Sequence, residues 1–144
     1  MLVSQILKSK ADERVMTVKP HITVAEAAAI LSEKRIGTLI VSRDGSRPEG
    51  ILSERDIVRE VGKRGAACLT DTVFVLMTHD PVTCTRGDTA DQVLQKMTDG
   101  RFRHLPVVEN GLMVGLISIG DVVKARLSEL SMEKTALEGM IMGN

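Results

Sequence analysis

Aromatic side chains are nearly absent from this sequence, which has two Phe and neither Trp nor Tyr. Proteins that bind single-stranded nucleic acid stack the bases on aromatic rings, so the composition disfavours this class. An excess of charge of one sign is missing as well, because 19 basic residues balance 19 acidic ones. This balance argues against a protein that coats nucleic acid or an anionic membrane.

Long apolar runs and a cysteine framework are also missing. The longest apolar runs reach four or five residues, far below the roughly 18 that a membrane-spanning helix needs. The opening MLVSQILKSKADER contains no apolar segment typical of a signal peptide. Cys68 and Cys84 are the only cysteines and form no C-x-x-C pair, which favours buried thiols over disulfides. We therefore expect a soluble cytoplasmic protein.

The usual signatures of catalysis and metal binding do not occur. His21, His79 and His104 are scattered without the spacing of a zinc site. The sequence contains neither G-x-G-x-x-G nor the phosphate loop G-x-x-x-x-G-K-[ST], and no residue stands in a nucleophile elbow. These absences predict a protein that is not an enzyme and has no metal site and no catalytic cofactor.

What the sequence does contain is an internal duplication. Its 144 residues suit a single domain. A shift of 66 residues aligns identical residues of the two halves, and a one-residue gap in a turn changes the shift to 65. The aligned pairs include Thr17/Thr83, Thr23/Thr89, Leu39/Leu105 and Val41/Val107, then Gly50/Gly115, Ser53/Ser118 and Asp56/Asp121. The period is longer than that of solenoid repeats, so we expect a pseudo-two-fold pair that shares one core.

Each copy is predicted to fold as β-α-β-β-α, which makes the protein an α/β (α+β) fold. Helices should open at Thr23 and Thr89, where TVAE and TADQ match the capping box S/T-x-x-E/Q. The middle strands are apolar almost throughout, which is typical of burial on both faces, and D-G or N-G then signals a hairpin. The expected strands are Val15–Val18, Thr38–Ser42 and Gly50–Ser53, repeated at Val82–Thr85, His104–Val108 and Val114–Ser118; the further helices begin at Ser53 and Ser118, and lead helices span Val3–Lys8 and Val73–Thr78.

The composition also suggests boundaries. Because the Gly/Ala-rich link Gly62–Asp71 separates the copies, we expect a first repeat with its lead helix at 1–66, a second repeat at 67–127 and a helical tail at 128–144. The last helix should run to about Gly139, with an apolar stripe of heptad-like spacing. The stripe consists of Val123, Leu127, Leu130, Leu137 and Ile141. An uncovered stripe predicts a homodimer, and the alternative is a helix that folds back onto its own repeats.

The motif that most strongly indicates ligand binding is S-x-x-D, found in GILSERD (Gly50–Asp56) and GLISIGD (Gly115–Asp121). Unpaired backbone N–H groups at a helix start favour a phosphate there, and a carboxylate can accept both hydroxyls of a ribose. The structural alternative is that Ser-x-x-Asp only caps the helix. Caps more often end in Glu or Gln, as at Thr23 and Thr89, and the two roles are compatible.

With these motifs and RHLPVVENG (Arg103–Gly111), the sequence resembles the tandem cystathionine-β-synthase (CBS) domain pair, or Bateman module, over roughly residues 1–127. The resemblance implies a regulatory module that binds AMP, ADP, ATP or NAD(H) between the repeats and acts on an unknown protein in trans. It implies that the motif Asp residues hold the ribose and the motif Ser residues lie near ribose and phosphate. The implied nucleotide site contains Thr17, Thr38, Ile40, Ser53, Asp56, Thr83, His104, Pro106, Ser118 and Asp121.

Cations for the phosphate are expected from Arg55, Arg103 and His104, as contacts to the ligand or to a dimer partner. The second motif has Ile119-Gly120 where the first has Glu54-Arg55. The two sites are therefore not expected to bind identically. The alternative function is a structural or partner-docking dimer with no small-molecule ligand.

Overall fold

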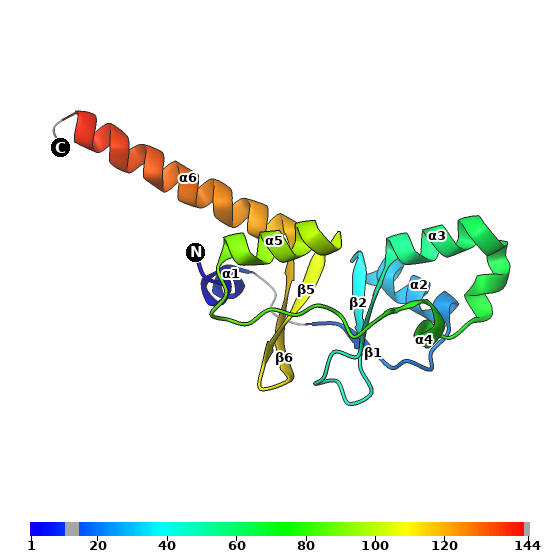
Figure 1. Ribbon diagram of the computed structural model, residues 1–144. Coiled ribbons are helices and arrows are strands. Elements are labelled where there is room, and N and C mark those ends of the chain that lie inside the picture. Colours follow the sequence, from blue (N-terminus) through cyan, green and yellow to red (C-terminus); the bar gives the residue numbers. More distant parts are fainter. Residues whose placement is uncertain (11–14, 143–144) are drawn as a thin grey trace.

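The computed structural model describes residues 1–10 and 15–142 and has two similar halves (Figure 1). The first half contains β1 (Thr17–Val18), α2 (Val24–Lys34), β2 (Thr38–Val41), β3 (Gly50–Ser53) and α3 (Glu54–Arg64). The second contains α5 (Ala90–Gly100), β5 (His104–Glu109), β6 (Leu112–Ser118) and α6 (Ile119–Ile141). The predicted α/β class and its two repeats are confirmed. Residues 11–14 and 143–144 of the predicted segments lie outside the described residues.

The two sheets differ in size although their registers correspond. In the first half the order is β1-β2-β3-β4, where β4 is Thr78–His79; β1 is parallel to β2 and the other pairs are antiparallel. In the second, β5 and β6 form an antiparallel pair, and the predicted strand Val82–Thr85 is reduced to one parallel bridge between Cys84 and Val107. At this bridge the Cys84 N–H donates to the Pro106 carbonyl at 3.0 Å, and the Cys84 carbonyl accepts from the Val108 N–H at 2.8 Å.

The caps predicted from the sequence form at the helix starts. Ser53, Thr89 and Ser118 each take part in a complete capping box, in which the side chains of the first and fourth residues bond each other's backbone N–H. At Thr23 the side chain accepts a hydrogen bond from the Glu26 N–H at 3.1 Å. Each such bond satisfies a backbone donor that a helix start leaves free.

The two lead helices are exchanged between the halves. Helix α1 (Val3–Ser9) begins beside α5, where Leu2 bridges Thr89, whereas the residue before α4 (Val73–Leu76), Thr72, bridges Thr23 at the start of α2. In Figure 1, α1 accordingly lies beside β5 and β6, and α4 lies beside α2. The sequence assigned each lead to the repeat that follows it, and the packing instead joins each to the other repeat. The boundaries at 66 and 127 stay a prediction.

Each half has its own hydrophobic core, so the expectation of one shared core is wrong. One cluster joins Val3 and Ile6 of α1 to α5, β5, β6 and α6, and the other joins Val73 and Met77 to α2, β2, β3 and α3. The link between the repeats is also ordered, as the 3-10 helix η1 (Gly65–Thr70), with Cys68 fully buried. The exchanged leads complete both cores and thereby tie the halves together.

The halves meet at their middle strands and at their hairpins. Thr38 Oγ1 of β2 lies 3.0 Å from His104 Nδ1 of β5, and the Met113 N–H donates to the carbonyl of Ser46 at 2.7 Å. Thr38 and His104 are repeat equivalents, separated by 66 residues. A hydrogen bond between equivalent residues lies on the axis that relates the repeats, so this pair marks the pseudo-two-fold axis.

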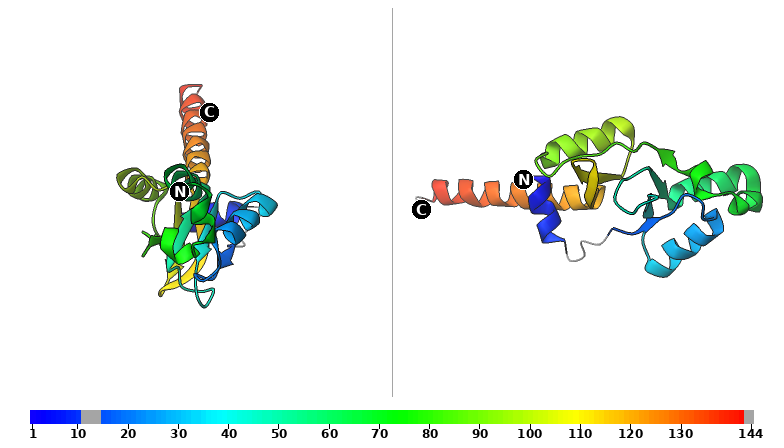
Figure 2. Two further views of the ribbon diagram at one scale, coloured as in Figure 1. Left: turned by 90° about the vertical axis from the view of Figure 1, so that its right-hand side faces the viewer. Right: turned by 90° about the horizontal axis from the view of Figure 1, so that it is seen from below.

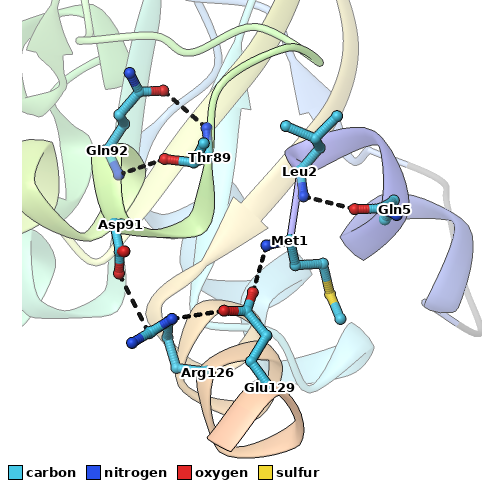
Figure 3. Close-up of polar contacts among 8 residues, drawn as sticks. All are labelled: Met1, Leu2, Gln5, Thr89, Asp91, Gln92, Arg126 and Glu129. Atoms are coloured by element: carbon cyan, nitrogen blue, oxygen red, sulfur yellow. Dashed lines mark hydrogen bonds and ion pairs between the residues drawn. The ribbon is translucent and has the colours of Figure 1, made fainter. Parts of the chain in front are cut away.

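Helix α6 extends well beyond the body of the protein (Figures 1 and 2). Only its first turns are packed, through Val122 and Ala125. Its base is tied to the N-terminus by Glu129, which pairs with the amino group of Met1, and to α5 by Arg126, which pairs with Asp91 (Figure 3). The alternative in which the helix folds back is wrong. Among the described residues, no helix combines the length and apolar character needed to span a membrane.

The Gly of each G-h-h-S motif makes room for the exchanged lead. A Cβ atom at Gly50 would lie 2.3 Å from Met77 Sδ, and one at Gly115 would lie 3.0 Å from both terminal carbons of Leu7. We expect Gly50→Ala to lower the free energy of unfolding by roughly 1–3 kcal/mol, since the buried Met77 must move in a packed core. Gly62→Ala is the control: this helical glycine has open space around it, and alanine should stabilise it by about 0.5–1 kcal/mol. Urea unfolding that finds Gly50→Ala as stable as the wild type would contradict this packing.

Candidate nucleotide-binding cleft

A cleft of about 1020 Å³ opens between the two repeats. Most of its residues come from α1, from the segment that leads into β2 in the first repeat, and from β6 in the second repeat. The lining residues are Ser4, Leu7, Lys8, Lys10, Val15, Met16, Lys34, Ile36, Gly37, Thr38, Arg86, His104, Val114, Gly115, Leu116 and Ser118. This volume lies at the upper end of the usual range for small-molecule sites.

The cleft combines apolar walls with cations. Met16, Ile36 and Val114 are among its apolar residues, while Lys8, Lys10, Lys34 and Arg86 bring positive charge. None of the described residues that line it is Asp or Glu. In a chain of zero net charge, such clustering favours a ligand with an apolar part and an anionic part.

Both motif aspartates act as helix caps. Asp56 Oδ2 and Asp121 Oδ2 each accept a hydrogen bond from the backbone N–H of the motif Ser at 2.9 Å. Asp56 also pairs with Arg59 on its own helix, through Oδ1. The capping alternative is therefore realised at both motifs, and a second role for either carboxylate must be compatible with it.

Asp121 has an additional partner at the cleft. Lys10 Nζ lies 2.9 Å from Asp121 Oδ2 and donates to the Leu116 carbonyl at 2.8 Å. Burial raises the pKa of Asp121, but the hydrogen bonds from Ser118 and the charge of Lys10 outweigh this and hold the pKa below its usual value. Asp121 is thus ionised at neutral pH.

His104 is uncharged in the free cleft at neutral pH. Its burial lowers the pKa of the imidazole, and the positive charges of Lys10 and Arg103 lower it further, against the opposing effect of Asp121. A neutral imidazole has one donor and one acceptor nitrogen. The Nδ1 atom faces Thr38, so the hydrogen-bonding role of the ring depends on the tautomer.

The structure brings together some of the sequence-predicted residues and not others. Thr38, His104 and Ser118 line the cleft, and Asp121 is joined to it through Lys10. The remaining predicted residues, Thr17, Ile40, Ser53, Arg55, Asp56, Thr83, Arg103 and Pro106, do not line this cleft. Their roles stay predictions.

Burial separates these remaining residues further. Ile40 and Pro106 are buried within β2 and β5, whereas Arg55 and Arg103 are exposed. Arg55 lines a shallower hollow of about 370 Å³ on α3, with Glu54, Val58 and Arg59.

Sequence reasoning missed the basic residues of the cleft. Lys8 and Lys10 come from α1 and the residue after it, which the sequence assigned to the first repeat but which pack against the second. Lys34 ends α2 and Arg86 precedes α5. In the sequence, these residues are distinguished only as basic residues near the ends of helices. Many ordinary surface residues fit the same description.

No group of three potential metal ligands occurs in the part of the chain that the structure describes. Cys68 and Cys84 are both buried and free. Burial raises the pKa of the Cys84 thiol to about 12, so it stays protonated and is a poor nucleophile at neutral pH.

The family model of the CBS domain matches the chain twice, over residues 3–63 and 72–128. The chain therefore belongs to the CBS domain family, and it contains two copies of the domain. This agrees with the duplication and with the fold.

Proteins of known structure or curated description resemble this chain over most of its length. A CBS-domain protein from Agrobacterium tumefaciens is 46% identical, with a TM-score of 0.82 over 88% of this chain and 99% of that chain. A CBS domain protein from Pyrobaculum aerophilum, solved in complex with AMP, is 30% identical, with a TM-score of 0.77 over 92% and 99%. The mitochondrial CBS domain-containing protein CBSX3 of Arabidopsis thaliana is 32% identical over 98% of this chain and 72% of that protein.

Proposed function

We propose that this protein is a regulatory module that senses an adenosine-containing nucleotide, AMP, ADP, ATP or NAD(H), in the cleft between its repeats. The observation that carries the proposal is the cleft itself: it has apolar walls and four cations, and it reaches Ser118 at the start of α6 and, through Lys10, Asp121. The AMP complex of the relative from Pyrobaculum aerophilum supports it. Binding across two repeats would change their relative position or the assembly, and so signal to a partner.

In this proposal the parts of the nucleotide match the parts of the cleft. The base lies against apolar residues such as Met16 and Ile36. The ribose hydroxyls donate hydrogen bonds to the carboxylate of Asp121. The phosphate lies near the start of α6, where the helix dipole favours an anion, and near the lysines. Asp56 has the corresponding role at the second site, with Ser53 beside it.

The protein is proposed to act by binding and not by catalysis. We also propose that it is a homodimer joined in part by α6, and that its target is a separate protein. The relative from Arabidopsis thaliana is named as mitochondrial, and a cytoplasmic location of this chain stays a prediction.

The competing function is a partner-docking dimer with no small-molecule ligand, which the exposed stripe of α6 favours. Thermal melting with AMP, ADP, ATP, NAD, NADH and S-adenosylmethionine separates the two. A ligand that binds the folded state raises its stability by RT ln(1 + [L]/Kd), about 2.7 kcal/mol at a hundredfold excess over Kd. We expect at least one adenine nucleotide to raise the Tm. A panel without any shift at millimolar ligand would favour the docking function.

The phosphate should contribute much of the affinity. We expect AMP to bind roughly 10- to 150-fold more tightly than adenosine, as for hydrogen bonds to a charged group, because cations line the cleft. Added salt should weaken AMP binding and leave adenosine binding nearly unchanged, since only the former involves ion pairs. Calorimetric titrations at two salt concentrations measure both effects. Equal affinities for adenosine and AMP would contradict a phosphate near these cations.

A further inference from the structure

Lys10 stands at the place where the proposed ribose site and phosphate site meet. Its Nζ bridges Asp121 Oδ2 and the Leu116 carbonyl, at 2.9 Å and 2.8 Å. Both the Lys10 and the Asp121 side chains keep about a quarter of their surface exposed, 27% and 21%. The ion pair is thus not sealed in the core, and because Lys10 lines the cleft, a ligand there can reach the lysine.

The carboxylate of Asp121 is already engaged in the free protein. Its Oδ2 accepts hydrogen bonds from both the Ser118 N–H and Lys10. A ribose diol that uses both oxygens of this carboxylate must compete with Lys10 for Oδ2. The Ser118 bond is part of the helix cap and need not break, whereas the lysine side chain has a flexible four-carbon stem.

The equivalent contact is missing from the first repeat. Leu7 contacts Gly115 as Met77 contacts Gly50, and Leu2 bridges Thr89 as Thr72 bridges Thr23. Both correspondences have an offset of 70 residues, which places Asp80 opposite Lys10. An aspartate there cannot pair with Asp56, which instead bonds Arg59.

The surroundings of the first motif differ in the same way. Strand β4 (Thr78–His79) pairs with the edge of β3, whereas the corresponding edge residues of β6, Gly115 and Leu116, line the cleft. The basic lining and the open edge therefore belong to the cleft that contains Lys10.

We propose that Lys10 is the residue that makes this cleft specific for phosphorylated nucleosides. In the free protein it neutralises Asp121; when a nucleotide binds, it releases Asp121 to the ribose and pairs with the phosphate. A nucleoside without phosphate displaces the lysine and offers it no anion in return, so its binding is penalised. This inference rests on the proposed function and adds the means by which the cleft distinguishes its ligands.

The test is the affinity of Lys10→Met for adenosine and AMP, measured by calorimetry on the full chain. Methionine keeps a flexible apolar stem of similar length and removes the charge. We expect adenosine to bind several-fold more tightly and AMP roughly tenfold more weakly, on the scale of one charge-assisted contact. Lys10→Arg should restore the preference for AMP. Lys63→Met is the control for net charge, because Lys63 is exposed on α3 and does not line the cleft.

The outcomes are distinguishable. The role of Lys10 is supported if Lys10→Met binds adenosine more tightly and AMP more weakly than the wild type does, and Lys63→Met shows neither change. If Lys10→Met weakens both ligands equally, or neither, then Lys10 does not determine the preference, although the nucleotide site itself stands. If the wild type binds neither ligand and no nucleotide of the melting panel raises its Tm, the proposed function fails and the role of Lys10 fails with it.

Discussion

Truncation after Arg126 is expected to convert the protein from a dimer to a monomer or to lower its stability markedly. The removed segment carries most of the apolar stripe of α6, and the stripe is open to solvent: Leu127 is 63% exposed, Leu137 59% and Ile141 84%. An exposed apolar stripe on a projecting helix is a liability unless another chain covers it. Heptad-like spacing is the pattern by which two helices pack along such a seam. Light scattering after size-exclusion chromatography, at micromolar protein, measures the change.

This truncation also removes Glu129, which pairs with the Met1 amino group and with Arg126 (Figure 3). A second truncation, after Ser131, keeps these contacts and separates dimer loss from loosening of α1. Within the full chain, Leu130→Lys with Leu137→Lys should dissociate the dimer. Ala136→Lys should not, because Ala136 is exposed and precedes Leu137 in the sequence but lies on another face of the helix. A monomeric wild type would contradict the proposed dimer. Truncated chains that remain equally stable dimers would move the interface to the repeats.

Replacing the motif aspartates should have the largest effect on nucleotide binding. We expect Asp121→Ala and Asp56→Ala each to weaken AMP binding at one site by roughly 1.5–3 kcal/mol, or about 10- to 150-fold, because each removes a charged acceptor of the ribose hydroxyls. The double variant should lose both sites. Calorimetry gives the affinities and the stoichiometry. Wild-type affinity in the double variant would refute the assignment of both carboxylates.

These substitutions also remove a helix cap, so the effect on stability needs a control. Gln92 has the same capping position at α5, where its side chain accepts the Thr89 N–H at 2.8 Å. Gln92→Ala should therefore cost a similar amount of stability, about 1 kcal/mol. It should leave AMP affinity unchanged, because Gln92 does not line the cleft. A loss of affinity in all three variants would point to destabilisation and not to a contact with the ligand.

The acid dependence of stability should reflect His104 and Asp121. The pKa of His104 is lowered on folding, so as the pH falls below its unfolded value the unfolded chain takes up more protons and stability decreases. The lowered pKa of Asp121 removes further stability as the pH falls below about 4. His104→Gln should flatten the first of these two declines. Urea unfolding between pH 7 and pH 3 measures both, and an unchanged profile in His104→Gln would contradict burial of a neutral imidazole.

Local sequence signals were sufficient for most of the fold. Caps at Thr89, Ser53 and Ser118 and the apolar middle strands act within a few residues, and each repeat supports the interpretation of the other. The strand Val82–Thr85 was overestimated, because a residue's tendency to be extended does not supply a partner for its backbone. In the structure only Cys84 of this segment bridges β5.

The site was less accessible to sequence analysis because it depends on long-range packing. Ser118 and Asp121 follow from the motif, but the cleft joins them to Lys10 and to Thr38, more than 60 residues away in the chain. The exchange of α1 and α4 has no local signal, since either lead could cover either core. The sequence therefore does not identify Lys10 as a site residue, although Lys10 contacts the Asp121 carboxylate that the motif identifies.

The most direct test of a nucleotide site between the repeats is a crystal structure of the full chain grown with AMP. We predict density for AMP in the cleft bounded by α1, β2 and β6, with the ribose at Asp121 and the phosphate near the start of α6. An AMP molecule bound elsewhere, or an empty cleft at a concentration where calorimetry shows saturation, would contradict the account.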